Sequence, residues 1–259
     1  MTHLAVTWWG HASTTVELGG ARVATDPLLG RRLLHLRRAS PTPPPAAAVA
    51  DLVLVSHLHH DHLHVPSLRR FGAHVPVVVP RGAPRAVPAL RRLSCIEALP
   101  GDSLDVAGVR VEVLRAEHDG HRDVRRGRLP GGHAAPALGF RFEHDGRSCW
   151  YPGDTGPQPG LAAVAPVDLA LVPIGGWGPS LGEHHLDPAQ AAAAVAAVGA
   201  GIVVPVHYGT FWPVGLRRLH PRSHRELFVD PPARFRAAAR EAGLGAEVVV
   251  PAPGERVER

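Results

Sequence analysis

Short apolar runs alternate with turn signals along this chain, and most runs have the length of a β-strand. The first runs predict strands over residues 2–8, 13–18 and 21–25. Gly19-Gly20 is typical of the tight turn of a hairpin between the last two strands. Residues 51–56 form a continuous apolar run, which indicates a strand that is buried on both faces.

The rest of the chain mixes strands with helices. Further strands are predicted over residues 75–79, 103–106, 109–116, 137–143, 147–152, 168–174, 202–206 and 247–250. Helices are predicted over residues 66–71, 187–199 and 232–242, the second with Asp187 as its N-cap and Pro188 in the first helical position. Two stretches predict long irregular loops: residues 28–50, where prolines are dense, and residues 120–135, which are rich in glycine, arginine and histidine.

Meanders come first in the chain, and β–α–β units follow in its second half. This order favours an α/β fold of the αββα type, in which two mixed sheets pack face to face with helices outside. The chain has 259 residues and shows neither an internal repeat nor an interior linker, so we expect one domain over residues 1–259.

The composition is typical of a globular protein. Hydrophobic residues make up 45% of the chain and charged residues 20%. No apolar run approaches the length of a bilayer span, and the N-terminus lacks the pattern of a signal peptide. We therefore expect a cytoplasmic protein without an integral membrane segment. Cys95 and Cys149 make no disulfide framework and are expected to be buried thiols.

The net charge is +5, and every basic residue other than histidine is an arginine. The arginines are scattered and no nucleic-acid-binding motif accompanies them, so we expect a small-molecule substrate and no nucleic acid. Residues 31–38 hold four arginines: Arg31, Arg32, Arg37 and Arg38. This loop either attracts an anionic substrate or is solvated and disordered, and the sequence leaves both hypotheses open. The sequence is also compatible with a homo-oligomer.

Histidine stands out, with 18 residues that cluster along the chain. Directly after the buried strand, residues 57–62 have the form H-x-H-x-D-H. His57 and His59 stand two apart in extended chain, so they point the same way and can hold one metal ion. Asp61 and His62 face a position a few ångströms away, and two cations about 3.5–4 Å apart are the usual arrangement of a two-metal site. A histidine-rich surface loop is the alternative.

The order of the later motifs resembles the metallo-β-lactamase superfamily over nearly the whole chain. In that family the H-x-H-x-D-H motif precedes a lone histidine, a Gly-Asp pair and a last histidine after a strand. Here the matching segments are Ala116-Glu-His118, Gly153-Asp154-Thr155 and Pro205-Val-His207. The resemblance implies the metallo-β-lactamase fold and a hydrolase with a binuclear metal site.

The resemblance also implies a ligand set. The first metal would be held by His57, His59 and His118. The second metal would be held by Asp61, His62 and His207, with Asp154 as the bridge between the two ions. His121 lies three positions after His118 and is an alternative to it.

Such a ligand set defines the expected chemistry. Imidazoles combined with carboxylates suit two divalent ions, zinc first, with manganese or iron as alternatives. A water between two such ions loses a proton near neutral pH and becomes a nucleophile for an ester-like bond. No serine or cysteine nucleophile pattern competes.

A narrower resemblance points to the branch that holds N-acylphosphatidylethanolamine phospholipase D and ascorbate-6-phosphate lactonase. It is carried by Trp8-Trp-Gly-His11-Ala-Ser13, Thr25-Asp26-Pro27, Pro173-Ile-Gly-Gly-Trp-Gly178 and His185-Leu-Asp-Pro188. It implies cleavage of a phosphodiester or a lactone, and a substrate-contacting His185, for which capping or packing is the alternative. Two positions differ from the phospholipase-like members: His60 stands where they usually have a tyrosine, and His64 stands where they often have an aspartate. Their lipid specificity therefore does not carry over to this chain.

Our candidate catalytic residues are Asp61 and His185. Asp26 either accepts a proton from a ligand imidazole or serves a turn. Packing is the favoured interpretation for His11, while Trp177 either walls the pocket or belongs to the core. Alternative functions are a thioester hydrolase, a di-iron redox scaffold and a metal-binding module without catalysis; the redox version normally needs a flavin domain, which we do not expect here.

Overall fold

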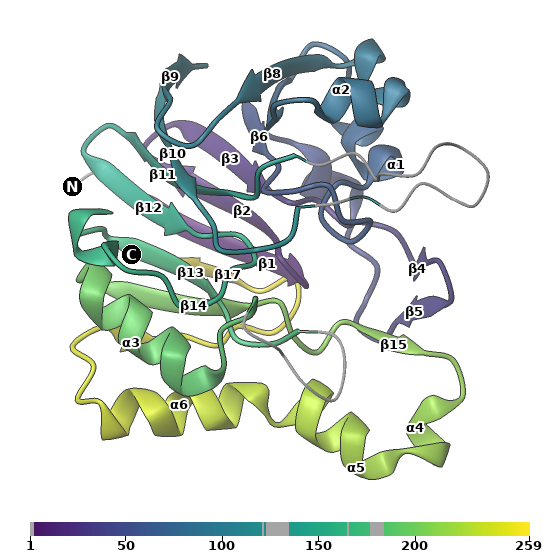
Figure 1. The fold of residues 1–259 in the computed structure, drawn as a ribbon, viewed down its shortest axis with the longest axis vertical. Helices are drawn as coiled ribbons and strands as arrows, with labels where there is room; N and C mark the ends of the chain where they lie inside the picture. The colour runs from purple at the N-terminus through teal and green to yellow at the C-terminus, as the bar shows by residue number, and fades with distance from the viewer. Residues whose placement is uncertain (1–2, 121, 123–134, 165, 177–183) are drawn as a thin grey trace.

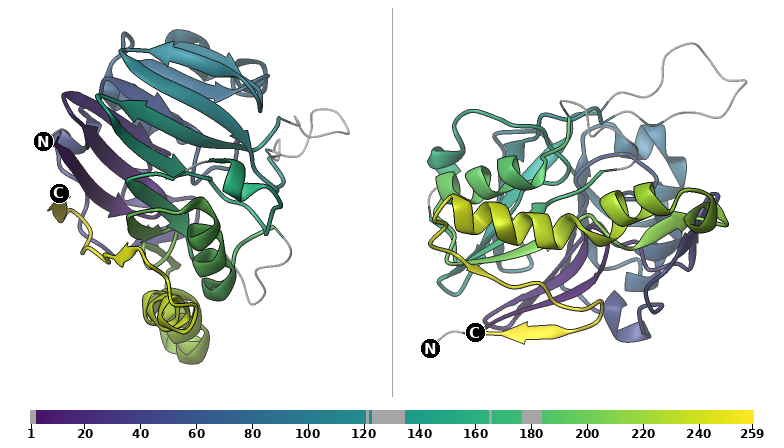
Figure 2. Two further views of the ribbon diagram at one scale, coloured as in Figure 1. Left: turned by 90° about the vertical axis from the view of Figure 1, so that its left-hand side faces the viewer. Right: turned by 90° about the horizontal axis from the view of Figure 1, so that it is seen from below.

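The fold is an αββα sandwich, as the sequence predicts. The structure is a computed structural model that describes residues 3–120, 122, 135–164, 166–176 and 184–259. Two seven-stranded sheets pack face to face, and helices cover their outer faces (Figures 1 and 2).

The first sheet has the strand order β17-β1-β2-β3-β6-β7-β8. Its strands are β1 (Leu4–Gly10), β2 (Ser13–Leu18), β3 (Ala21–Thr25), β6 (Leu52–Leu54), β7 (Pro76–Pro80), β8 (Ser94–Ala98) and β17 (Arg256–Glu258). The first three form the predicted antiparallel meander, and β3, β6, β7 and β8 then run parallel. Strands β8 and β17 are not among the predicted strands.

The second sheet has the strand order β16-β14-β13-β12-β11-β10-β9. Its strands are β9 (Ser103–Val106), β10 (Val109–Arg115), β11 (Leu138–His144), β12 (Arg147–Tyr151), β13 (Leu169–Pro173), β14 (Ile202–Val206) and β16 (Glu247–Val248). Strands β9 to β12 are antiparallel neighbours, and β12, β13, β14 and β16 are parallel. The turn between β11 and β12 has positive φ at Asp145 and Gly146, as expected for this hairpin pair.

The main core lies between the two sheets. Leu52 and Leu54 of β6 point into this core, while Val53 packs on the other side against the helical layer. This double burial explains the continuous apolar run at residues 51–56.

Helical segments cover both outer faces. The first sheet is covered by η1 (Pro45–Ala48), α1 (Val65–Leu68), η2 (Arg69–Phe71), α2 (Ala83–Ala86) and η3 (Pro88–Arg92). The second is covered by η4 (Leu161–Val164), α3 (Pro188–Val198) and α6 (Pro231–Glu241). In α3 the Asp187 side chain accepts from the backbone N–H of Gln190 in a capping box, and Gly199 ends the helix in the left-handed region.

The prediction of an irregular loop over residues 28–50 is wrong for part of this range. Strands β4 (Arg32–Leu33) and β5 (Leu36–Arg38) form a hairpin, which pairs with β15 (Phe211–Pro213) in a small third sheet. The prolines that disfavour strands all follow the hairpin, at residues 41–45. The partner strand β15 is remote in sequence, so local composition gives no sign of it.

Three short helical segments connect β15 to α6: α4 (Leu216–Leu219), α5 (Pro221–His224) and η5 (Arg225–Val229). Most of the predicted loop over residues 120–135 lies outside the described residues. In the described part of the chain, no helix is both long and apolar enough to cross a membrane. The expectation of one domain stays a prediction.

Candidate metal centre

The candidate ligands follow the carboxyl ends of strands from both large sheets. His11 follows β1, the loop 57–62 follows β6, His118 follows β10, Asp154 follows β12 and His207 follows β14. Residues from five separate segments therefore meet at one place, although the sequence spreads them over almost two hundred positions.

The first predicted group is brought together. The ligand atoms of His57, His59 and His118 all lie within 4.8 Å of one another. Nε2 of His57 lies 2.9 Å from Nδ1 of His59, and Nε2 of His118 lies 3.3 Å from the same atom. Three imidazole nitrogens thus converge on a single point, as three protein ligands of one metal ion do.

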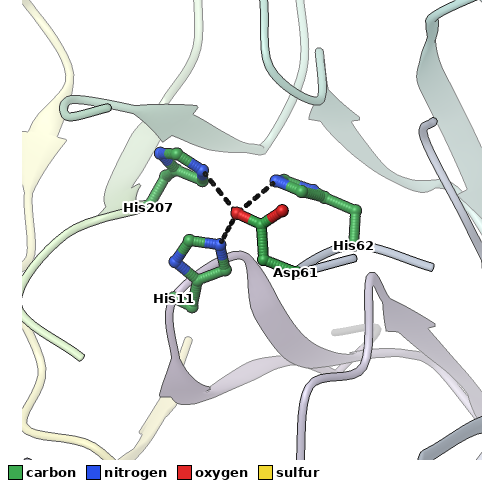
Figure 3. Close-up of side chains that lie close together, drawn as sticks. All are labelled: His11, Asp61, His62 and His207. Atoms are coloured by element: carbon green, nitrogen blue, oxygen red, sulfur yellow. Dashed lines mark hydrogen bonds and ion pairs between the residues drawn. The ribbon is translucent and has the colours of Figure 1, made fainter. Parts of the chain in front are cut away.

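The second predicted group also converges, and it contains one more histidine than the resemblance implied. Figure 3 shows the imidazoles of His11, His62 and His207 around the carboxylate of Asp61. Oδ2 of Asp61 lies 3.7 Å from Nε2 of His62 and 3.9 Å from Nε2 of His207. It lies 2.9 Å from Nε2 of His11.

Asp154 lies between the two groups. Its Oδ2 is 3.2 Å from Nε2 of His62 and 3.0 Å from Nε2 of His207. A carboxylate oxygen of Asp154 also lies within 4.8 Å of ring nitrogens of His118 and His185. This is the position that a bridging carboxylate needs.

The predicted histidine ligands present defined atoms to the centre. Nδ1 of His118 lies 2.9 Å from the carbonyl oxygen of His184, and Nδ1 of His207 lies 2.6 Å from that of Gly175. A carbonyl oxygen only accepts hydrogen bonds, so in both residues Nδ1 carries a proton and donates it. Nε2 is then the nitrogen that points inward and that a metal ion can bind in place of a proton.

Asp26 fixes two further ligands. Nδ1 of His62 donates to Oδ2 of Asp26 at 2.6 Å, and the Ser56 hydroxyl donates to the same oxygen at 2.5 Å. Because its proton is used there, Ser56 Oγ accepts from Nδ1 of His57 at 2.9 Å. Tyr151 also donates its hydroxyl to Asp26. Asp26 thus orients one predicted ligand of each metal, which agrees with the outer hydrogen-bonding role proposed from the sequence.

The electrostatics divide the two groups. Burial holds the pKa of His57, and less strongly those of His59 and His118, below the usual value, so these imidazoles are neutral near pH 7. Burial also lowers the pKa of His62, but the carboxylates of Asp154, Asp61 and Asp26 outweigh it and raise that pKa well above the ordinary value. Protons therefore compete little for the first group, whereas the raised pKa values of His62 and His207 favour competition between a proton and a metal ion in the second.

The unpaired atoms fit a metal. Among the described residues, seven buried side-chain atoms make no well-aligned hydrogen bond, and four of them belong to this centre: His62 Nε2, Asp154 Oδ1, His185 Nδ1 and His207 Nε2. The two Nε2 atoms lie close to Oδ2 of Asp154, but without the alignment of a hydrogen bond. Buried polar atoms without partners are costly, and their concentration at one point indicates a ligand that would pair with them. Nitrogen and oxygen donors suit zinc, manganese or iron.

His11 was assigned to packing from the sequence, but the structure places it inside the centre. Its side chain is buried, with 1% of the residue exposed, and its Nε2 donates to Asp61. Burial, with a contribution from His207, lowers the pKa of His11 to about 4, so the ring is neutral near pH 7. The only sequence signal was its place in the Trp-Gly-His motif directly after a strand.

The remaining candidates lie around the centre. His185 lies at its edge, with Nδ1 3.9 Å from Oδ2 of Asp154. His60 belongs to none of the candidate metal groups of the described residues, and Arg122 donates to its Nδ1 at 2.9 Å. Arg122 also donates to the carbonyl oxygens of Leu58 and Leu63, so it holds the ligand loop, and no local pattern in the sequence marks this role. His121 and Trp177 lie outside the described residues.

The comparisons with known proteins agree with the fold. A family model described as the β-lactamase superfamily domain matches residues 21–208, which is most of the chain. The chain belongs to the metallo-β-lactamase superfamily. Igni18, a metallo hydrolase of the archaeon Ignicoccus hospitalis, matches the whole chain with a TM-score of 0.71 at 24% identity, and the match covers 99% of that structure.

Two relatives connect this metallo-β-lactamase domain to enzymes. A UPF0173 metal-dependent hydrolase of Methanopyrus kandleri is 28% identical over 99% of this chain and 100% of its own length. An N-acyl-phosphatidylethanolamine-hydrolyzing phospholipase D of Caenorhabditis elegans is 29% identical over 88% of this chain and 70% of its own length. The protein is a metal-dependent hydrolase of this superfamily, and the predicted family and enzyme class are confirmed.

Proposed function

We propose that this protein is a binuclear hydrolase that cleaves an ester-like bond, with a phosphodiester or a lactone as the substrate class. The observation that carries the proposal is the pair of adjacent donor groups that share Asp154. One group offers three imidazole nitrogens, and the other offers His62, His207 and Asp61. Two ions at these groups would be close enough to act on one substrate.

When bound, two divalent ions would polarise the substrate oxygen and lower the pKa of a water held between them. Zinc is the proposed metal, with manganese and iron as alternatives. The protein's own residues supply the rest. Asp26 orients the imidazoles of His62 and His57 through their Nδ1 atoms, and Asp154 would bring negative charge close to both ions and so reduce their repulsion.

His185 is the proposed substrate-contacting residue. It comes just before the N-cap of α3, and its side chain is 20% exposed, whereas Asp154 and His207 are almost fully buried. Burial lowers the pKa of His185 to about 4, so near pH 7 the ring is neutral and can donate or accept a hydrogen bond. A neutral imidazole at the edge of the centre suits a contact with the substrate.

The phosphodiester class is supported by the Caenorhabditis elegans relative, whose name describes the hydrolysis of a phospholipid. The shared sequence covers most of both chains, but the identity of 29% leaves the substrate itself open. A lactone or a thioester is attacked at a carbonyl carbon by the same centre, so these substrates belong in the same test.

The test combines metal analysis with a substrate panel. Protein purified without chelator and reconstituted with zinc, manganese or iron is analysed for metal and assayed with phosphodiesters, lactones, thioesters and β-lactams. We expect about two metal ions per chain and hydrolysis of the phosphodiester or the lactone. Asp154→Ala should lose the second ion and most of the activity, while Asp105→Ala, which removes an exposed carboxylate on β9, should keep both.

Each outcome has a clear meaning. A metal content near zero after reconstitution contradicts the ligand assignment. Two ions without hydrolysis of any substrate indicate a metal-binding module, and iron with redox activity indicates the oxidative alternative. Wild-type turnover in Asp154→Ala means that the bridge lies elsewhere.

A further inference from the structure

One corner of the molecule combines exposed arginines with exposed aliphatic side chains. It consists of residues 31–37, which make up the β4–β5 hairpin without its last residue Arg38, and residues 214–225, which contain α4 and α5. We call these two segments the basic corner. In Figure 1 they lie together at the right and lower right, on either side of β15.

The two segments are physically joined. β15 pairs with β5, so that Trp212 lies opposite Arg37 and Pro213 opposite Leu36. The chain then continues from β15 directly into residues 214–225. A hairpin near the N-terminus and a helical segment near the C-terminus are therefore neighbours through β15.

The basic corner exposes large aliphatic groups. Leu34 is 65% exposed, Val214 71% and Leu219 72%. In the described part of the chain only five large hydrophobic residues are exposed, and these three belong to the basic corner. A single exposed leucine is ordinary, but a concentration at one corner indicates a surface that meets an apolar partner.

The basic corner is also strongly positive. Its seven exposed arginines are Arg31, Arg32, Arg37, Arg217, Arg218, Arg222 and Arg225, of which Arg225 alone lies near a carboxylate beyond the segment, 3.7 Å from Asp230, among the ion pairs of the described residues. Neither segment contains an aspartate or a glutamate. The three arginines of the hairpin line one hollow of about 420 Å³, which gives a phosphate-sized group several guanidinium donors at once.

The surface adjoins the metal centre. A small cavity beside His11 and His207 is also lined by Trp212 of β15 and by Phe228, which follows α5. Trp212 and Phe228 flank residues 214–225 in the chain, so they connect the basic corner to the candidate metal centre.

We infer that the basic corner binds the surface of an anionic phospholipid bilayer. Arginines are attracted to acidic headgroups, while Leu34, Val214 and Leu219 leave water by entering the boundary between headgroups and acyl chains. An acidic protein or a nucleic acid would match the charge, but exposed aliphatic groups gain little from a phosphate backbone. The inference concerns binding alone and does not depend on the substrate.

The first test uses the wild-type chain and two kinds of vesicle. One contains phosphatidylcholine alone, and the other contains phosphatidylcholine with about one third phosphatidylglycerol. In a sedimentation assay we expect the protein to bind the anionic vesicles at least about tenfold more tightly than the neutral ones. The bound protein should dissociate from the anionic vesicles as salt rises. No binding to either vesicle, or equal binding to both, would overturn the inference. So would salt-sensitive binding to a DNA duplex without binding to anionic vesicles.

Variants then locate the surface. Arg31→Gln, Arg32→Gln and Arg37→Gln together should weaken binding to anionic vesicles roughly 100-fold, because each arginine near such a surface contributes about 1 kcal/mol. Leu34→Ser, Val214→Ser and Leu219→Ser together should weaken it as well, and should leave a remaining binding that salt abolishes.

The matched control removes the same charge elsewhere. Arg81, Arg91 and Arg92 are exposed and lie near α2 and η3, outside the basic corner. Their replacement by glutamine should change binding only a few-fold. If the control set weakens binding as much as the hairpin set, the attraction comes from net charge and the assigned surface is wrong. Circular dichroism of every variant checks that the fold is retained, and the wild-type comparison tests the inference without any variant.

Discussion

Oδ2 of Asp26 lies 2.6 Å from Nδ1 of His62, and both side chains are fully buried. The same oxygen accepts from the hydroxyls of Ser56 and Tyr151. One carboxylate at the end of β3 thus receives three side-chain donors, and through Ser56 it also orients His57. The rigidity of both predicted metal sites depends on this residue, which is not itself a predicted ligand.

Replacement of Asp26 should therefore affect stability and metal binding together. In Asp26→Asn the amide NH₂ group faces donors, so buried polar groups lose their acceptor, and we expect a loss of about 3–5 kcal/mol in the free energy of unfolding. Metal affinity should fall roughly 10–100-fold. Tyr151→Phe removes only one donor and should cost about 1–3 kcal/mol with little change in metal affinity. Urea unfolding and metal titration check both values, and equal effects of the two variants would contradict the assigned role.

His11 gives a prediction that separates the two metal sites. Its N–H orients Asp61, which belongs to the second group alone. His11→Ala should weaken the second metal about 10–100-fold and leave the first metal in place. His11→Asn is a useful second variant, because φ of residue 11 is +54° and asparagine tolerates this left-handed region better than alanine. Competition with a chelator, with the exposed His74→Ala as control, measures the two affinities; parallel loss of both ions would refute this role.

The two sites should also differ in their response to pH. Protons compete with the metal for Nε2 of each ligand. The pKa of His57 is lowered by burial, so the first site stays deprotonated well below pH 6.5. Burial also lowers the pKa of His207, but Asp154 more than offsets this and raises it, as with His62, so protons displace metal from the second site at higher pH.

On acidification the metal content should therefore fall in two steps, from about two ions to about one and then to none. Dialysis at successive pH values, followed by elemental analysis, measures these steps. Loss of both ions in a single step, or retention of the second-site ion at the lower pH, would show that this charge balance does not control binding.

Local patterns predicted the elements and the ligand loop well, and long-range contacts account for what was missed. The alternation in β10 and the capping box of α3 are properties of neighbouring residues, so the sequence carries them directly. The spacing of His57 and His59 likewise predicts a shared metal. His118, Asp154 and His207 lie far along the chain from that motif, and only the family resemblance connected them to it. The contact of His11 with Asp61 spans 50 residues, and no local pattern marks it.

Arg38 shows the same limit within one short segment, since the sequence grouped it with Arg31, Arg32 and Arg37. The structure separates it from them: Arg38 is 7% exposed, and its guanidinium donates to the backbone carbonyl oxygens of Gly30, Trp9 and Leu28. It also lies over the ring of Phe211, 4.7 Å from the centroid. Arg38 therefore holds the hairpin to the body of the protein and is not available to an anionic substrate.

The hairpin arginines should consequently give two different phenotypes. Arg38→Gln leaves buried carbonyl oxygens without a donor and should cost about 2–4 kcal/mol of stability. Replacement of Arg31, Arg32 and Arg37 with glutamine should cost less than about 0.5 kcal/mol, because exposed side chains contribute little to stability. In the proposed hydrolase the triple variant should instead raise KM for an anionic substrate much more than for a neutral ester. That difference should shrink as salt rises, since exposed charges are screened over about 10 Å at 0.1 M. Urea unfolding and steady-state kinetics measure the two effects, and equal changes in KM for both substrates would remove the exposed arginines from substrate recognition.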